Sequence, residues 1–217
     1  MQIKTKLLCI LWLLGTNAFT QNVQRDLDSY FLALSQNQEF NGNILFAENG
    51  GIIYQKSFGY ADFKKKIKNT DSTLINVASI SKNFTAIAVL QLKEKGKLRL
   101  DDTFIKYFPE FPYPEITIKH LLSHTSGLPD NEALLDSIIS KNPGKIITNV
   151  DIIPALILYK KAKELRFKTG EKKWGYSNIG YSLLALLIEK VSKQLFDVYL
   201  RKEIFIPAGM AHTYLQT

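Results

Sequence analysis

The feature that most constrains the fold is an apolar segment that begins just after a Ser-x-x-Lys motif. Ser79 and Lys82 form the motif, and residues 84–92 after it are apolar at most positions. Such a run predicts a helix that is buried on nearly every side. Residues three apart share one helical face, so we expect the Lys82 amine to lie beside the Ser79 hydroxyl.

This spacing suits nucleophilic catalysis. A helix N-terminus carries partial positive charge, which favours alkoxide character at Ser79 and an oxyanion formed next to it. A buried lysine tends to lose its proton, and a lowered pKa is what a general base at Lys82 requires. The structural alternative is that Ser79 is an N-cap residue and Lys82 a surface residue.

A second element, Tyr176-Ser177-Asn178, is the single Tyr-x-Asn of the chain. A tyrosine phenol, with an ordinary pKa of about 10, becomes a plausible proton shuttle when an ammonium stabilises its phenolate. The amide of Asn178 offers a donor and an acceptor that suit a substrate amide or the lysine. The structural alternatives are a buried tyrosine with a satisfied hydroxyl, and Asn178 as the N-cap of the next helix.

In these two motifs the chain resembles the serine β-lactamase and penicillin-binding-protein superfamily, and most of all its class C β-lactamase, D,D-peptidase and esterase branch. Further phrases typical of that branch are FGYAD at 58–62, GKLRLDD at 96–102, ITIKHLLSHTSGL at 116–128 and IFIPAGM at 204–210. The resemblance runs from about residue 42 to the last residue. It implies an α/β (α+β) fold of the β-lactamase/transpeptidase type, in which an N-terminal hairpin pairs with C-terminal strands beside a helical lobe.

The resemblance also implies a third element, Lys-Thr-Gly or His-x-Gly, on a strand well beyond the phrase that ends at Met210. The sequence ends at Thr217, so we expect a partial domain that lacks the C-terminal third and those strands. Residues 168–170 read Lys-Thr-Gly, but they stand where relatives have a turn, and Gly170 supplies a permissive backbone there. In the family, the third strand supplies one oxyanion-hole N–H and groups that bind a substrate carboxylate.

Local patterns predict the other elements. Helical spacing predicts an amphipathic helix from Val23 to Leu34, and Asn49-Gly50 predicts a hairpin between strands 43–47 and 51–58. The remaining expected features are a helix end at Gly96, a short helix capped by Thr117, a capping box of Thr148 with Asp151, an apolar helix over 178–187 and a last helix over 196–203. We expect residues 21–96 to form part of an α/β lobe with the nucleophile helix, and residues 97–217 to be mainly helical.

Residues 1–20 have the pattern of a signal peptide. Lys4 and Lys6 precede an apolar stretch at 7–14 that is too short to span a membrane, and small polar residues follow it. The one cysteine, Cys9, lies inside this segment. We therefore expect a secreted or periplasmic product without disulfides and without a stable membrane anchor.

Charge and ligand patterns exclude other classes. The net charge is +8, but runs such as Lys64-Lys65-Lys66 are usually solvated faces, and no nucleic-acid motif accompanies them. The three histidines show no metal-ligand spacing, so we expect neither metal nor other cofactor. His124 lies in the family phrase and is expected to be a hydrogen-bonded structural residue. We expect a monomer.

The resulting hypothesis is serine acyl transfer. Ser79 attacks a carbonyl, Lys82 or Tyr176 accepts its proton, the Ser79 N–H is one oxyanion donor and Asn178 positions the substrate. By resemblance, the substrates are β-lactams, D-alanyl peptides of the cell wall, or small esters. The alternatives are a catalytically inactive truncated fragment and a penicillin-sensing module that is acylated without turnover.

Overall fold

The computed structural model describes residues 23–216, except 131–133, 136–138 and 141–143. These residues form two compact units, which divide between Asn76 and Val77. The helix that follows the Ser-x-x-Lys motif therefore starts the second unit, whereas the sequence groups it with residues 21–96. The expected signal peptide at 1–20 lies outside the described residues.

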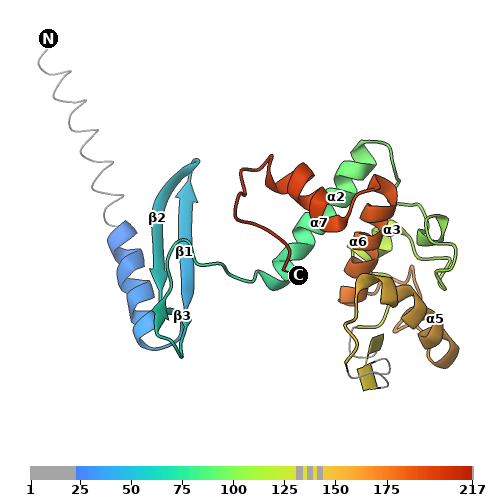
Figure 1. The fold of residues 1–217 in the computed structure, drawn as a ribbon, viewed down its shortest axis with the longest axis horizontal. Coiled ribbons are helices and arrows are strands. Elements are labelled where there is room, and N and C mark those ends of the chain that lie inside the picture. Colours follow the sequence, from blue (N-terminus) through green and yellow to red (C-terminus); the bar gives the residue numbers. More distant parts are fainter. Residues whose placement is uncertain (1–22, 131–133, 136–138, 141–143, 217) are drawn as a thin grey trace, which may run out of the picture. The chain divides into compact units, whose positions relative to one another are not determined.

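The first unit is a helix beside a hairpin (Figure 1). A helix over residues 23–36 precedes β1 (Gly42–Glu48), which pairs with β2 (Gly51–Phe58) in an antiparallel two-stranded sheet. Asn49 and Gly50 between them have φ angles of 50° and 80°, as a two-residue turn with two positive φ angles requires. The predicted hairpin is therefore confirmed. A second small ladder joins β3 (Tyr60–Asp62) to β4 (Ile67–Lys68).

Aromatic rings hold the helix of the first unit to its hairpin. Phe31 of the helix lies 6.3 Å from Phe46 of β1 and 6.2 Å from Phe58 of β2, between ring centroids. Phe40 completes the cluster at 5.4 Å from Phe31. Since large rings bury apolar area where they meet, this cluster packs the helix against both strands of the hairpin.

The second unit is helical. Its elements are η1 (Ala78–Ile80), α2 (Ser81–Glu94), η2 (Phe104–Lys106), α3 (Ile118–Leu122), η3 (Asn149–Asp151), α5 (Ile152–Ala162), α6 (Asn178–Ser192), α7 (Phe196–Leu200) and the π-helical turn η4 (Arg201–Phe205). The apolar helix α6 lies at the centre, where it contacts α2, α3, α5 and α7. Its side chains Ile179, Leu183, Leu184 and Leu187 are completely buried. No helix within the described ranges is long and apolar enough to cross a membrane.

Helix α2 is buried on one side only. Ala88, Val89 and Leu92 are fully buried, whereas Ile87 and Leu90 are 43% and 42% exposed. Within the second unit, α2 is therefore buried on one face and not on nearly every side as predicted. Within the second unit, α6 and α7 pack against α2 and bury one of its faces. Lys82, in the first turn, is half-buried.

Short-range signals place the helix ends as predicted. Gly96 has a φ of 67° after α2, and the N–H of Lys97 returns to the Leu92 carbonyl at 2.9 Å, which is a Schellman end. Thr117 caps α3 by accepting from the His120 N–H. Thr148 and Asp151 form the expected capping box.

Asp102 fixes the loop that precedes α3. Its carboxylate accepts hydrogen bonds from the Arg99 N–H at 2.8 Å and the Tyr107 hydroxyl at 2.6 Å. Lys106 adds an ion pair at 2.9 Å. Burial raises the pKa of Asp102, but these three donors together lower it to about 2. Asp102 is thus a loop residue, as its sequence position suggests, and its backbone carbonyl accepts from the Ile118 N–H.

Candidate active site

Ser79 lies in the tight turn η1 that leads into α2. Ala78 before it has a left-handed φ of 44°, which costs a residue with a Cβ of the order of 1 kcal/mol. The hydroxyl of Ser81 donates to the Ala78 carbonyl at 2.6 Å and holds the turn. Neither Ser79 nor any other side chain caps η1 or α2, so the interpretation of Ser79 as an N-cap is wrong. Its exposed hydroxyl is available for other contacts.

Those contacts bring together all four side chains that the sequence singles out. The Ser79 Oγ lies 2.6 Å from the Tyr176 Oη. The Lys82 Nζ donates to the Ser79 Oγ at 3.2 Å and to the Asn178 Oδ1 at 2.7 Å. The Ser-x-x-Lys motif at the start of α2 and the Tyr-x-Asn motif at the start of α6 therefore form one hydrogen-bonded cluster, because α2 packs against α6.

The cluster makes the phenol of Tyr176 more acidic. The nearby ammonium of Lys82 and then the Ser79 hydroxyl lower the pKa of Tyr176, although partial burial acts in the opposite direction. The Lys82 Nζ lies 4.9 Å from the centroid of the Tyr176 ring. Tyr176 is 37% exposed and Ser79 is also exposed, so the second unit does not enclose these two residues. The interpretation of Tyr176 as a buried aromatic is wrong.

The side chain of Asn178 can face Lys82 because the residue before it caps the helix. Ser177, not Asn178, is the N-cap of α6, and its Oγ accepts from the Gly180 N–H at 3.4 Å. The same hydroxyl donates to the Pro129 carbonyl at 3.0 Å. Asn178 is therefore the first helical residue, and its amide oxygen faces Lys82 instead of the helix end.

The loop that carries Tyr176 is held by the guanidinium of Arg166. Its Nη2 donates to the carbonyls of Gly175 at 2.9 Å and Tyr176 at 2.8 Å. Its Nε donates to the Leu128 carbonyl at 2.7 Å. Sequence reasoning did not find Arg166, because a surface arginine and a carbonyl clamp have the same sequence pattern.

Gly127 and Gly170 adopt positive φ angles in the segments that pack beside the Tyr176 loop. Gly127 has a φ of 75°, and a Cβ there would stand 2.2 Å from the carbonyl oxygen of Phe167. Gly170 has a φ of 86° in a turn, where the Thr169 hydroxyl donates to the Ser126 carbonyl at 2.9 Å. The Lys-Thr-Gly at 168–170 is thus a turn, as expected.

Aromatic rings surround the cluster. His124 stacks on Tyr176 with 4.7 Å between centroids and 29° between planes. Trp174, which is 67% exposed, meets the His124 ring edge-on at 5.8 Å. The sequence predicts a structural role for His124 and does not single out Trp174. The signal available was the position of Trp174 two residues before Tyr176.

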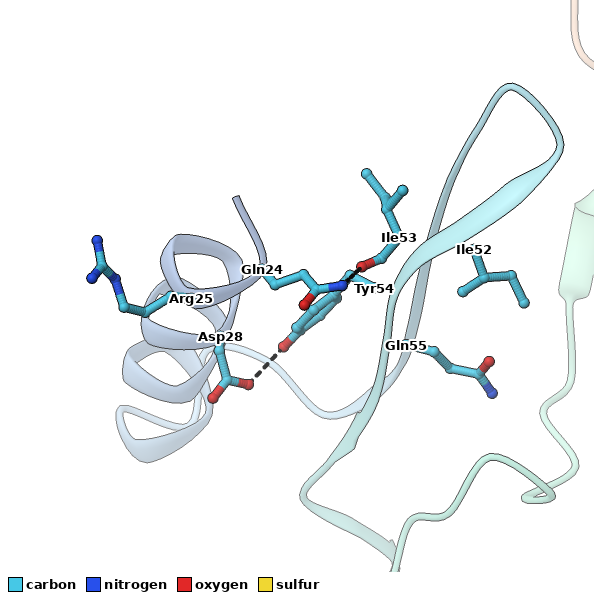
Figure 2. Close-up of a pocket in the computed structure, with 7 residues that line it drawn as sticks. All are labelled: Gln24, Arg25, Asp28, Ile52, Ile53, Tyr54 and Gln55. Atoms are coloured by element: carbon cyan, nitrogen blue, oxygen red, sulfur yellow. Dashed lines mark hydrogen bonds between the residues drawn. The ribbon is translucent and has the colours of Figure 1, made fainter. Parts of the chain in front are cut away.

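A different hollow lies in the first unit, between the helix over 23–36 and β2 (Figure 2). It has a volume of about 560 Å³, and two hydrogen bonds join polar groups that line it. Asp28 accepts from the Tyr54 hydroxyl at 3.0 Å, and Gln24 donates to the Ile53 carbonyl. None of the four predicted site residues lines it. Among the residues that the structure describes, no group of three or more His, Cys, Asp or Glu side chains is arranged to hold a metal ion.

Comparison with known proteins identifies the family. The Beta-lactamase family matches residues 21–217. Penicillin-binding protein 4* of Bacillus subtilis (strain 168) is 40% identical over 193 residues, which is 89% of this chain and 42% of that protein. A penicillin-binding protein from Bacillus halodurans superposes with a TM-score of 0.69 at 31% identity, over 82% of this chain and 54% of that one. EstCE1, a hydrolase with promiscuous acyltransferase activity, superposes with a TM-score of 0.71 at 25% identity, over 86% of this chain and 52% of that one.

These likenesses confirm the β-lactamase/transpeptidase-like fold, represented here by the N-terminal hairpin and the helical region. The chain spans about two fifths of the length of curated relatives that it matches. The Ser79, Lys82, Tyr176 and Asn178 cluster lies in the matched region. The chain therefore belongs to the Beta-lactamase family, whose matched relatives include penicillin-binding proteins and a hydrolase.

Proposed function

We propose that the protein is a serine hydrolase that acts by acyl transfer through Ser79. The observation that carries this proposal is the hydrogen-bonded contact of Ser79 with both Tyr176 and Lys82. A serine hydroxyl is a weak nucleophile by itself, and an adjacent base with a lowered pKa activates it. The nearest group of that kind is the Tyr176 phenol, at 2.6 Å.

Of the two candidate proton acceptors, the geometry favours Tyr176. Its oxygen is closer to the Ser79 Oγ than the Lys82 Nζ is, at 2.6 Å against 3.2 Å. Lys82 lowers the pKa of Tyr176, and it donates to Asn178 as well as to Ser79. In this assignment Lys82 is the ammonium that stabilises the phenolate, and Asn178 orients Lys82 and the substrate.

The reaction then follows from these positions. The Ser79 Oγ forms a bond to the substrate carbonyl carbon while its proton passes to the Tyr176 phenolate. The carbonyl oxygen becomes an oxyanion, for which the Ser79 N–H is one donor. Collapse of this intermediate breaks the C–N or C–O bond, and the Tyr176 proton goes to the leaving nitrogen or oxygen. Water releases the acyl group as an acid and restores the Ser79 hydroxyl.

The proposed substrates are β-lactams, D-alanyl peptides or small esters. The names of the relatives support β-lactams and the acyl-transfer chemistry, since they describe penicillin-binding proteins and a hydrolase with acyltransferase activity. The signal-like segment at 1–20 supports a secreted or periplasmic location, where cell-wall peptides and β-lactams are found. We further propose that the protein acts as a monomer, without a nucleic-acid partner or a stable membrane anchor.

The test is the intact mass of the protein after incubation with a penicillin and, separately, with a fluorophosphonate. We expect one adduct on the wild type, none on Ser79→Ala and an unchanged adduct on Ser29→Ala, because the exposed Ser29 hydroxyl donates to the Arg25 carbonyl of its own helix in the first unit. An adduct that decays with release of product indicates a hydrolase. A stable adduct indicates penicillin binding without turnover. No adduct on a folded chain would contradict acyl transfer and leave the non-catalytic alternative.

A further inference from the structure

His124, in the loop after α3, makes several contacts with Tyr176, the candidate proton acceptor, and with the residues beside it. It follows α3 with a left-handed φ of 57°, so its backbone turns sharply there. Its ring stacks on Tyr176 at 4.7 Å and lies tilted against Tyr181 at 5.2 Å, between centroids. Trp174 closes a third side at 5.8 Å. The half-buried imidazole thus contacts three aromatic rings, one of which carries the phenol of the candidate proton acceptor.

Two hydrogen bonds join His124 to the backbone on both sides of Tyr176. The Nδ1 of His124 accepts from the Ser177 N–H at 3.1 Å. Its backbone carbonyl accepts from the Gly175 N–H at 2.9 Å. Since the residues before and after Tyr176 are both tied to His124, the position of the phenol depends on this residue as well as on the guanidinium of Arg166.

Because the Nδ1 of His124 accepts a hydrogen bond, the charge of the imidazole follows. An imidazole that accepts at Nδ1 carries its hydrogen at Nε2 and is neutral. The charged groups that face it are Lys82 from α2 and Arg166 from the loop after α5, both positive, while Tyr176 and Tyr181 present phenols. Burial in the first place, and then the charges of Lys82 and Arg166, lower the pKa of His124. Protonation would turn the acceptor into a donor aimed at the Ser177 N–H.

We propose that His124 is a positioning residue for Tyr176. Its neutral ring accepts from the Ser177 N–H and stacks on the phenol, and so keeps the Tyr176 oxygen within hydrogen-bond distance of the Ser79 hydroxyl. The inference rests on the proposed function for its catalytic consequence, but the geometry that it invokes exists without a substrate. It goes beyond a purely structural role, because it ties the protonation of His124 to the acylation of Ser79.

Two substitutions separate the parts of this role. His124→Phe keeps an aromatic ring against Tyr176 and removes the acceptor, whereas His124→Asn keeps an acceptor and suits a left-handed backbone. We expect the acylation rate constant of Ser79 to fall about 10- to 100-fold in His124→Phe, with substrate binding little changed, because small misplacements of reacting groups have effects of this size. His124→Asn should restore most of that loss at neutral pH.

The pH profile distinguishes positioning from bulk stability. In acid, the wild-type rate should fall relative to that of His124→Asn, because only the imidazole becomes charged. His120→Phe controls for the loss of a histidine acceptor, since His120 also accepts a backbone N–H, that of Thr117, but caps α3. Its acylation rate should stay within about threefold of the wild type. Equal losses in the two Phe variants, or a constant rate ratio between wild type and His124→Asn at every pH, would overturn the inference.

Nitrogen-15 NMR of the histidines tests the inference without any turnover. We expect His124 to be neutral at pH 7 with its hydrogen on Nε2, and the Tyr176 ring resonances to shift when His124 is protonated. A cationic ring or an Nδ1–H tautomer would overturn it. If the wild type gives no adduct, the proposed function fails, and these spectra still decide whether His124 positions Tyr176.

Discussion

Replacement of Ser177 by alanine tests how the start of α6 is held. The Ser177 side chain is 1% exposed and makes two hydrogen bonds. It accepts from the Gly180 N–H as the N-cap of α6 and donates to the carbonyl of Pro129. Both contacts disappear in Ser177→Ala, and alanine is small enough to enter the site without a clash.

The expected loss follows from these two contacts. Removal of an N-cap hydroxyl costs about 1 kcal/mol of helix stability. Loss of a buried hydrogen bond to a carbonyl costs about 1 kcal/mol more. Because both bonds belong to one side chain, we expect the free energy of unfolding of the second unit to fall by about 2 kcal/mol in total.

The assay is urea denaturation followed by tryptophan fluorescence. In a chain expressed from Gln21, Trp174 is the one tryptophan and reports on the second unit. Ser182→Ala is the matched control, because it makes the same exchange inside α6, where alanine is a better helix former. A loss below about 0.5 kcal/mol in Ser177→Ala, or equal losses in the two variants, would refute the reasoning.

Three further predictions follow from single contacts. Tyr176→Phe should lower the acylation rate of Ser79 about 10²- to 10⁴-fold, as measured by the rate of adduct formation in mass spectra, because it removes the proposed proton acceptor; a rate within threefold of the wild type would exclude Tyr176 from that role. Gly127→Ala should destabilise the second unit by more than about 2 kcal/mol in urea, because its Cβ meets the Phe167 carbonyl and its φ is positive. A loss of less than about 1 kcal/mol in the free energy of unfolding would show that the backbone near Phe167 moves to accommodate the Cβ. Asp102→Asn should lower stability at neutral pH. The wild-type advantage should disappear as pH falls from about 4 to about 2, because the folded pKa is about 2 against an ordinary value of 3.8; an advantage that persists at pH 2 would contradict the assigned ion pairing.

The elements that sequence predicts well are those fixed by neighbouring residues. Asn49 and Gly50 specify a turn by their own backbone preferences, and Thr117 specifies a helix start by a bond three residues away. The two active-site motifs are also short and local. Their meeting follows from the apolar character of α2 and α6, which requires the two helices to pack.

The predictions that failed depend on distant contacts. Ser177 and Asn178 are both good N-cap residues, and local propensity cannot choose between them. The choice is made by the carbonyl of Pro129, which takes the Ser177 hydroxyl, and by Lys82, which takes the Asn178 amide. The burial of α2 was overestimated for the same reason, since apolar composition does not say how many neighbours a helix has.

The separation of the reacting groups along the chain links the site to folding. Ser79 and Tyr176 are 97 residues apart, whereas Ser79 and Lys82 are 3 apart. With a loop-closure entropy of (3/2)RT ln n, the first contact costs about 3 kcal/mol more to close in an unordered chain. The contact between the phenol and the hydroxyl therefore requires α2 to pack against α6. A reagent that labels Ser79 would report on this packing, and the yield of labelling during refolding would follow the formation of the long-range contact.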